Sequence, residues 1–395
     1  MPGPLDGVTI LDLTRVLSGP YCTMLLADMG ARVIKIEQPG RGDDTRRWGP
    51  PFVGGESTYF LSVNRNKESV TLDFKSASGR DLLERLIARS DVLVENFRPG
   101  TLATVGLDFD SVHERYPRLI YASISGFGQT GPRRNQSGYD AVMQAEGGLM
   151  SITGEPAGEP VRLGVAIVDL VAGLFAVQGV LLALRARDHS GCGQQVDVGL
   201  FDSVISLLSY QASAYLNAAE TPARTGNRHP TIAPYDIVSA ADGDFFLAIG
   251  NDDQFRRFCL IAGLEHLADD MRFATNPGRV VHYAELRRIL SAALIERSRS
   301  EWLSQLMAAD VPCGAVRDIP EVFNDVQVAA RQMVEAIDHL TAGTVKVLGM
   351  PVKLSATPAS IRTAPPILGQ HTDAVLAELG VDAAAIAQLR AQAII

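Results

Sequence analysis

The chain has 395 residues, which predicts two or three domains, and its 46% apolar and 21% charged residues allow a substantial core and exclude global disorder. A formal net charge of −9 disfavours nucleic-acid binding but is compatible with a local basic pocket for a phosphorylated ligand. The seven histidines show no ligand spacing and the cysteines form no C-x-x-C pair, so we expect no metal site and a reduced, cytoplasmic location; the four cysteines are Cys22, Cys192, Cys259 and Cys313.

Strands and helices alternate over the first third of the chain. The N-terminus has no basic region followed by an apolar one, so we expect no signal peptide. The alternation predicts a doubly wound, Rossmann-like parallel sheet. The expected strands are Val8–Leu13, Arg32–Glu37, Ser69–Phe74, Val92–Glu95 and Leu119–Ser125. The expected helices are Tyr21–Met29, Ser78–Arg89 with Ser78 as its N-cap, and Asp110–Tyr116.

Loops rich in arginine, glycine and proline separate these elements. In a doubly wound fold the loops after the strands gather at one edge, where ligands bind. Their basic residues could form a phosphate-binding rim, and the competing interpretation of each is a solvated surface side chain. These residues are Arg41, Arg46, Arg47, Arg65, Lys67, Lys75 and Arg98.

The segment Gly126–Gly131, GFGQTG, matches the G-x-G-x-x-G pattern of dinucleotide-binding proteins. That fingerprint belongs in the first strand–helix turn and opens a helix. Here a looped stretch follows as far as Tyr139, and the first turn, Thr14–Pro20, lacks the glycines. The context of the motif therefore argues against a nicotinamide-dependent dehydrogenase, and we keep this function as a remote alternative.

The stretch Gly164–Leu184 is almost entirely apolar and contains one acid, Asp169. A transmembrane helix has the right length, but the acid would then lie in the apolar slab. The favoured interpretations are a helix buried on all sides, with Asp169 either a satisfied structural acid or a working carboxylate. Near the helix start the dipole would keep Asp169 ionised, as a base or as a nucleophile, and the pattern does not choose between these roles.

The second half of the chain has a different pattern of predicted elements. A second apolar helix, Leu200–Ala219, is followed by the linker Thr221–Pro234, and then by a hairpin of Tyr235–Ser239 and Phe245–Ile249. Further helices are expected at Asp252–Ala262, His282–Arg297 and Glu301–Ala309, with Ser300 as a cap, and the strand-like Val345–Ser355 precedes two terminal helices. We expect a large domain over 1–220, a smaller α+β domain over 225–325, and a C-terminal segment, 345–395, that returns to the large domain.

Several stretches taken together resemble the family III CoA-transferases, which include the α-methylacyl-CoA racemases. The resemblance covers nearly the whole chain, and its strength lies in the order and spacing of motifs that are weak singly. The stretches are Leu11–Asp43, Tyr59–Ser76, Asp91–Gly100, Ile124–Pro132, Ser137–Gly154, the Asp169 helix and Pro365–Thr372.

The resemblance implies an acyl-CoA:carboxylate CoA-transferase that forms an interlocked homodimer. Asp169 would be the nucleophile, Tyr139 would lie in the pocket, and a loop with Gly250 and Asn251 would cover it. CoA would pass from a donor acyl-CoA, expected to be succinyl-CoA, through an aspartyl-CoA thioester to a dicarboxylic acid such as glutarate. Acyl-CoA is then a substrate, and no tightly bound cofactor, nucleic acid or membrane is expected.

The CoA site carries over from the family by position. Some members have basic residues where this chain has Gln38 and Thr104, so phosphate contacts could come instead from Arg41, Arg98 or Arg133. The implied CoA-binding residues are Leu17, Ser18, Leu72, Lys75, Asn96, Phe97, Arg98, Gln136, Ser137, Gly138, Tyr139 and Asp140. The candidates for holding a distal carboxylate are Arg47, Arg162 and Arg228.

Two other functions compete with transfer. The racemases that resemble this chain have a histidine where it has Tyr139, and a phenol with a pKa near 10 is a poor partner for two-base proton exchange at Asp169. A non-catalytic acyl-CoA-binding protein, with Asp169 purely structural, is the second alternative.

Overall fold

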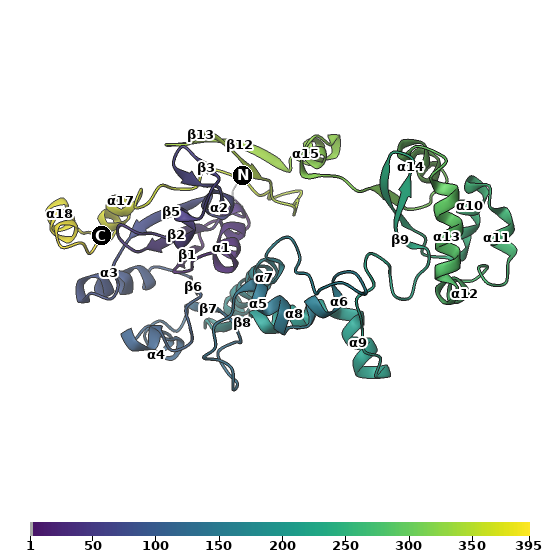
Figure 1. Cartoon of the computed structure of the whole chain (residues 1–395). Helices are drawn as coiled ribbons and strands as arrows, with labels where there is room; N and C mark the ends of the chain where they lie inside the picture. The colour runs from purple at the N-terminus through teal and green to yellow at the C-terminus, as the bar shows by residue number, and fades with distance from the viewer. Residues whose placement is uncertain (1–2) are drawn as a thin grey trace. The chain divides into compact units, whose positions relative to one another are not determined.

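The computed structural model describes residues 3–395, which divide into two compact units (Figure 1). Unit 1 consists of the chain up to Leu149, Leu163–Tyr210 and Val326–Ile395. Unit 2 consists of Met150–Arg162 and Gln211–Asp325. The chain therefore leaves unit 1 twice and returns to it twice.

Unit 1 is built on a six-stranded sheet in which every neighbouring pair is parallel. Two expected strands, Arg32–Glu37 and Val92–Glu95, have the predicted bounds. The sixth strand was not predicted, because it lies at the sheet edge and keeps exposed polar residues. The strands in spatial order are β5 (Lys67–Thr71), β2 (Arg32–Glu37), β1 (Thr9–Asp12), β6 (Val92–Glu95), β7 (Ile120–Ser125) and β8 (Gln195–Gly199).

This strand order places a switch point between β1 and β6, because the chain winds outward from this pair in both directions. Ligands of such sheets bind outside the carboxyl ends of the strands at that point. The segments that follow the two strands are joined there. The Arg15 backbone N–H donates to Asn96 Oδ1 at 2.9 Å, and Asn96 Nδ2 donates to the Arg15 carbonyl at 2.7 Å.

Helices cover both faces of the sheet, because consecutive strand residues such as Ile10 and Leu11 point to opposite sides and both are fully buried. One face packs against α1 (Ser18–Asp28) and α7 (Ile167–Ser190), and the other against α3 (Ala77–Ile87), α4 (Phe109–Arg115), α17 (Thr372–Glu378) and α18 (Ala383–Ala391). The α/β fold with a parallel sheet is thus as predicted.

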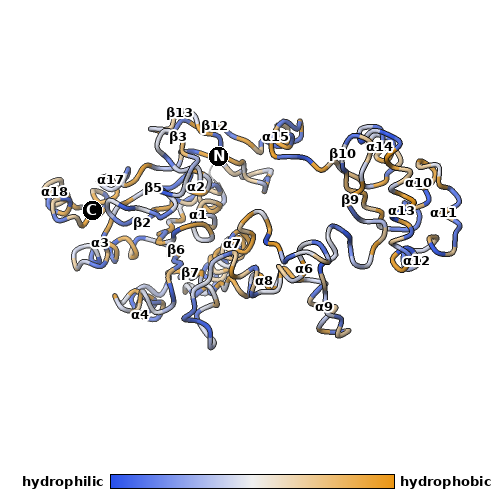
Figure 2. The backbone as a smooth tube through the Cα atoms, in the orientation of Figure 1, coloured by the Kyte–Doolittle hydropathy of each residue, from blue (hydrophilic) through white to orange (hydrophobic). Residues whose placement is uncertain are grey.

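Helix α7 differs from the expected all-round burial. Its buried stripe repeats every four residues, through Val168, Ala172, Ala176 and Val180. Other positions are open, Leu182 being 62% exposed, and Figure 2 shows the helix as largely apolar. It also extends beyond the apolar stretch, which ends at Leu184, through the charged residues Arg185–Asp188. Arg187 pairs with Asp91, and the helix ends only at Gly191, whose φ is +76°.

By length and composition alone, α7 could cross a membrane, and no other helix within residues 3–395 meets the same test. A core helix also meets it. The stripe of α7 that faces β7, β8 and α1 forms part of the core of unit 1. The observation is therefore weak evidence for a membrane span.

Two predicted helix caps and one predicted helix were wrong in detail. Ser76, rather than Ser78, caps α3 by accepting from the Gly79 N–H, and Ser298, rather than Ser300, forms a capping box with Glu301. A cap must precede the first helical turn, and the pattern placed both starts too late. The expected helix Leu200–Ala219 is split into α8 (Leu200–Leu207) and α9 (Ser209–Ala218).

Unit 2 contains the predicted hairpin, to which a third antiparallel strand is added. Its core is aromatic, with Phe245, Phe255, Phe258 and Trp302 buried together. The strands are β9 (Tyr235–Ala240), β10 (Gly243–Ala248) and β11 (Cys313–Ala315). The helices are α10 (Asp252–Ala262), α11 (Glu265–Asp269), α12 (Asn276–Val281), α13 (Tyr283–Leu294), α14 (Arg299–Ala308) and α15 (Ile319–Phe323).

Short elements complete the chain. Two hairpins are formed by β3 (Phe52–Val53) with β4 (Glu56–Ser57) and by β12 (Val334–His339) with β13 (Gly343–Leu348). The remaining helices are η1 (Asp44–Arg47), α2 (Thr58–Val63), η2 (Leu102–Val105), α5 (Asp140–Glu146), α6 (Leu149–Ile152) and α16 (Val326–Ala330).

Candidate active site

Asp169 is the third residue of α7, and the helix start is held by a second acid. Asp140 Oδ1 accepts from the Val168 N–H at 2.8 Å, which is one of the unpaired donors of the first turn. Gln144 Nε2 donates to Asp140 Oδ2 at 2.7 Å, and Gln144 Oε1 accepts from the Leu163 N–H at 2.8 Å. The start of α5 and the start of α7 are thereby tied together, with Asp140 next to Asp169.

The Asp169 carboxyl is not kept ionised by the helix dipole, contrary to the prediction. Burial raises its pKa, and the negative charge of Asp140 raises it further, to about 7. The dipole acts within the first turn but is outweighed here by the loss of hydration and by a like charge. Near neutral pH, Asp169 is therefore divided between its acid and its carboxylate forms.

Tyr59 is a site residue that the sequence did not indicate. Burial raises the pKa of its hydroxyl, and the charges of Asp169 and Asp140 raise it further, to about 12, so the phenol stays neutral close to both acids. Its ring meets Trp48 edge-on at 5.1 Å between centroids, and it packs in a cluster with Leu17 and Leu170. Tyr59 lies within the Tyr59–Ser76 stretch of the resemblance, but nothing in its spacing pointed to Asp169.

A cavity of about 540 Å³ opens at the carboxyl ends of β1, β2, β5 and β6. Three predicted CoA-binding residues, Leu72, Lys75 and Phe97, line it. Gln38 and Thr104, the positions that are basic in some members of the resembling family, line the same cavity. The cavity therefore has an apolar part and an exposed lysine, without the two additional cations.

The other predicted CoA-binding residues lie outside the lining of this cavity. Leu17 and Ser18, at the start of α1, are buried. Asn96 is bound to the backbone of Arg15, and Arg98 donates to Ser137 Oγ. The latter contact brings together two loops of the predicted site, those after β6 and β7. The rest of the predicted set forms the segment that leads into α5: Gln136, Gly138, Tyr139 and Asp140.

The predicted basic rim divides into two groups. Arg65 and Lys67 cannot form a rim, because they are buried in ion pairs with Asp28 and Asp12. Arg46 is partly buried and is engaged by Glu37. The exposed members are Arg41, Arg47, Lys75 and Arg98. Arg133 is engaged elsewhere: it pairs with Glu146, donates to Gln136 Oε1, and stacks over Phe127.

The residues predicted to cover the nucleophile belong to unit 2, whereas Asp169 belongs to unit 1. Within unit 2, Asn251 is the N-cap of α10, accepting from the Gln254 N–H at 2.9 Å, and the Gly250 N–H donates to Gln254 Oε1 at 2.7 Å. Tyr139 precedes α5 in unit 1, where its side chain is 67% exposed. Of the candidate arginines for a distal carboxylate, only Arg47 lies in unit 1.

The GFGQTG segment forms a turn. Gly128 and Gly131 have φ of +79° and +84°, the Gln129 N–H donates to Asp197 Oδ2 at 2.9 Å, and the next helix begins only at Asp140. The geometry of a dinucleotide fingerprint is thus not formed here. Within residues 3–395, no three His, Cys, Asp or Glu side chains are placed to hold a metal ion.

Comparison with known proteins identifies the family. The model of CoA-transferase family III matches residues 5–372. The chain is 43% identical over 382 residues to the succinate–glutarate CoA-transferase of Agrobacterium fabrum, covering 95% of this chain and 96% of that protein. It is 44% identical over 387 residues to the human succinyl-CoA:glutarate CoA-transferase, covering 98% and 88%.

A solved structure agrees with these relatives. The crystal structure of a CAIB/BAIF family protein from Brucella suis has a TM-score of 0.86 and 42% identity to this chain, covering 96% of this chain and 100% of that one. The predicted family is confirmed. The chain belongs to family III of the CoA-transferases and is a CoA-transferase of acyl-CoA metabolism.

Proposed function

We propose that this enzyme moves CoA from succinyl-CoA to a dicarboxylic acid, with Asp169 as the covalent nucleophile. The observation that carries the proposal is the environment of Asp169. It starts the longest helix of unit 1, its pKa is about 7, and it neighbours the segment around Asp140 that the resemblance assigns to CoA. An acid whose ionised form is this poorly stabilised is a stronger nucleophile than a solvated carboxylate.

The reaction consists of balanced acyl transfers. Ionised Asp169 attacks the donor thioester, which gives a mixed anhydride and releases CoA thiolate. The thiolate attacks the Asp169 carbonyl, which gives an aspartyl-CoA thioester and releases succinate. The acceptor carboxylate attacks this thioester to form a second anhydride and CoA thiolate, and attack of the thiolate on the acceptor carbonyl yields the new CoA ester and free Asp169. Each step exchanges one activated acyl group for another, so no step has a large thermodynamic cost.

The cavity at the switch point supplies a binding site for the nucleotide end of CoA. Its apolar residues, Leu72 and Phe97, suit a base, and the exposed Lys75 beside them suits a phosphate. Arg41 and Arg98 are exposed cations on neighbouring loops and would add phosphate contacts. Gln38 and Thr104 are neutral, so the exposed cations at this site are these three and Arg15, which also lines the cavity.

The acceptor class follows from the relatives. Two of them, at 43% and 44% identity, are named for transfer between succinate or succinyl-CoA and glutarate. A dicarboxylate needs a cation for the carboxylate that does not react. Arg47 is exposed, lies in the same unit as Asp169, and neighbours Trp48, which packs on Tyr59. We assign the distal carboxylate to Arg47.

The test combines an acceptor panel with detection of the covalent adduct. Succinyl-CoA is offered with glutarate, other dicarboxylates and monocarboxylates, and CoA esters are separated by chromatography. We expect dicarboxylates of about the length of glutarate to react fastest. Intact-protein mass spectrometry after addition of succinyl-CoA alone should show a hydroxylamine-sensitive CoA adduct, absent in Asp169→Ala. Turnover without an adduct would contradict the covalent route.

We further propose that the active form is a homodimer. The exposed apolar residues of α7, α8 and α9 are more than an isolated chain normally leaves in water. These residues include Leu174, Phe175, Leu181, Leu182, Ile205, Tyr210, Tyr215 and Leu216. Light scattering should give twice the 42.4 kDa of the chain, and a mass of one chain at micromolar concentration would contradict the dimer.

A further inference from the structure

The segment Thr14–Leu17, between β1 and α1, joins the two parts of the proposed site. Thr14 and Arg15 line the nucleotide cavity. Val16 and Leu17 pack in a cluster with Ala166 and Leu170, which flank Asp169 at the start of α7. A shift of this short segment would therefore change the alignment of bound acyl-CoA with the nucleophile.

The backbone of this segment is strained. Val16 has a φ of +72°, in the left-handed region, which a β-branched residue rarely adopts. Such a conformation persists only where the surroundings over-determine it, and it clusters at functional sites. A glycine would adopt this φ without strain but would also leave the segment freer to move.

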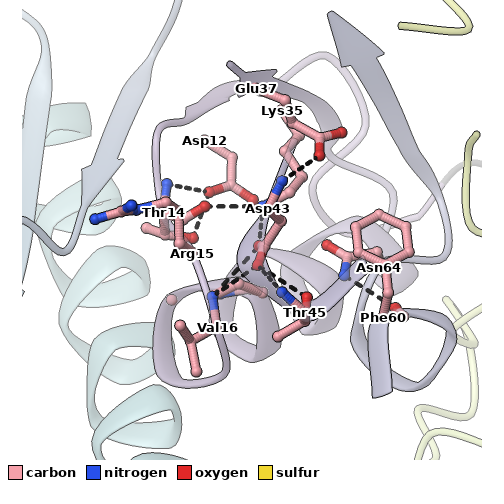
Figure 3. Close-up of polar contacts among 12 residues, drawn as sticks. Asp12, Thr14, Arg15, Val16, Lys35, Glu37, Asp43, Thr45, Phe60 and Asn64 are labelled. Carbon is pink, nitrogen blue, oxygen red and sulfur yellow. Dashed lines mark hydrogen bonds and ion pairs between the residues drawn. The ribbon is translucent and has the colours of Figure 1, made fainter. Parts of the chain in front are cut away.

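Asp43 provides the constraint, as Figure 3 shows. The Val16 N–H donates to both of its carboxylate oxygens at 3.3 Å. The Thr45 N–H and Oγ1 donate to Asp43 Oδ1 at 3.0 and 2.8 Å, which fixes the orientation of the carboxylate. Lys35 Nζ donates to Asp43 Oδ2 at 3.0 Å and to the Thr14 carbonyl at 2.8 Å. The Lys35–Asp43 pair thus binds the segment on both sides of Arg15.

The burial of this pair is the second part of the argument. Both side chains are fully inaccessible to solvent. A buried ion pair is weak evidence for stability, because desolvation offsets most of the attraction. The buried pair Arg65–Asp28 serves as a comparison, since it has similar burial but contacts neither the cavity nor Thr14–Leu17.

We propose that the Lys35–Asp43 pair is a positioning device, which holds Val16 in its strained conformation and thereby aligns acyl-CoA with Asp169. This inference rests on the proposed roles of Asp169 and of the cavity. Neither Lys35 nor Asp43 takes part in the chemical steps. Both act through the backbone of Thr14–Leu17.

The first variant is Asp43→Asn. An amide has one acceptor oxygen, whereas four donor groups converge on the two oxygens of Asp43, so the hold on Val16 is weakened. We expect kcat to fall on the order of 10- to 100-fold, the effect of a misalignment of about 1 Å. The Kd of CoA should not rise, because Lys35, which lines the cavity, keeps its charge and its hydrogen bond to the Thr14 carbonyl. The matched control is Asp28→Asn, which breaks the comparison pair and should lower Tm while kcat stays within about threefold.

A suppressor separates positioning from general damage. In the Asp43→Asn background, Val16→Gly removes the strain that Asp43 no longer compensates, so kcat should recover at least about fivefold. Thr45→Val serves if Asp43→Asn does not fold, because it leaves the ion pair intact. It loses one hydrogen bond to Asp43 and should lower kcat roughly fivefold. Unchanged kcat in both Asp43→Asn and Thr45→Val would overturn the inference, as would an equal loss in Asp28→Asn or no recovery with Val16→Gly.

Adduct formation by the wild-type enzyme distinguishes a failure of the positioning proposal from a failure of the proposed function. The aspartyl-CoA adduct on Asp169 is measured in every variant. If the wild type forms the adduct while the Asp43 variants form it at the wild-type rate, positioning fails and the proposed function stands. If the wild type turns over without an adduct, the proposed role of Asp169 itself fails.

Discussion

Two acids of unit 1, Asp12 and Asp169, have opposite electrostatic environments. Asp12, at the end of β1, is fully buried, and burial alone would raise its pKa. The cations Lys67 and Lys35 and two hydroxyl donors outweigh that effect and lower the pKa to about 2. Asp169 receives no such compensation, and burial together with a like charge raises its pKa to about 7.

Asp12 is the less accessible of the two acids and still has the lower pKa, so the contrast shows that partners, rather than burial, decide the ionisation of a carboxylate. Asp12 accepts from Thr14, Thr23 and Lys67 and organises the chain around the cavity. Asp169 lies beside a second acid, and its carboxylate form is destabilised. The first is a structural anion that is always charged, and the second is held close to its own titration point, as expected for a nucleophile.

The largest effect expected from this comparison is the loss of activity in Asp169→Ala. Removal of a covalent nucleophile should lower kcat by roughly 10⁴-fold or more. Asp188→Ala is the control, because Asp188 is an exposed acid on the same helix. The measurement is succinyl-CoA-dependent transfer under saturating acceptor. Residual activity above about one-tenth in a folded Asp169→Ala enzyme would show that the reactive acid lies elsewhere.

The structural acid should instead govern stability. Lys67→Met leaves Asp12 without its nearest cation, at a position where both side chains are fully buried. Breaking such a pair lowers the free energy of unfolding by about 3–5 kcal/mol. Urea unfolding gives the value, and Arg41→Ala, which breaks the exposed pair with Asp44, is the control at about 0.5 kcal/mol or less. A loss below about 1 kcal/mol in Lys67→Met would mean that Lys35 and the hydroxyl donors hold Asp12 without Lys67.

The raised pKa of Asp169 should lower the stability of the folded protein at neutral and alkaline pH. Because the pKa of Asp169 is raised in the folded state, the folded protein binds more protons between about pH 4 and 7, and stability falls as pH rises through that window. Asp169→Asn removes this penalty, so the variant should be more stable than the wild type by about 1–3 kcal/mol at pH 8. The advantage should shrink at pH 5. Thermal unfolding at both pH values tests it, and a constant difference would point to packing instead of ionisation.

The smallest effect concerns the neighbour of Asp169. The transfer rate requires the carboxylate, so kcat/KM should rise with pH through about 7. Asp140→Asn removes the charge that raises the pKa of Asp169 but keeps an oxygen for the Val168 N–H. The rising limb should therefore move to lower pH, and it should not move in Asp188→Asn. A limb that stays in place would show that burial alone sets the pKa.

The fold was largely predictable because its signals are local. The apolar strands and the helices between them follow the periodicity of their own residues, and β2 and β6 have the predicted bounds. The edge strand β8 was missed because its polar residues face solvent, and the caps Ser76 and Ser298 lie two residues before the predicted ones. These errors arise where the solvent exposure of a strand or the first residue of a helix depends on its position in the folded protein.

The candidate site was predictable in part, through its motifs. Asp169 at a helix start was indicated by the apolar stretch around it, and the cavity residues Leu72, Lys75 and Phe97 were indicated by the resemblance. Tyr59 was not, because its coupling to Asp169 joins residues far apart in the chain. Arg65 and Lys67 were assigned to a ligand rim because a sequence does not show whether a cation already has a buried partner.

The sequence by itself therefore determined the parallel sheet, the family and the acid at the start of α7. Only the tertiary structure decided how readily each buried or partly buried acid ionises. Asp12 ends the strand TILD and Asp169 follows the run GVAIV, so the two look alike along the chain. Lys67 lies 55 residues from Asp12, and folding brings their side chains to 3.1 Å, whereas it brings Asp140 to Asp169. Because ionisation depends on distances between groups that are remote in the chain, the state of each acid is a property of the folded molecule.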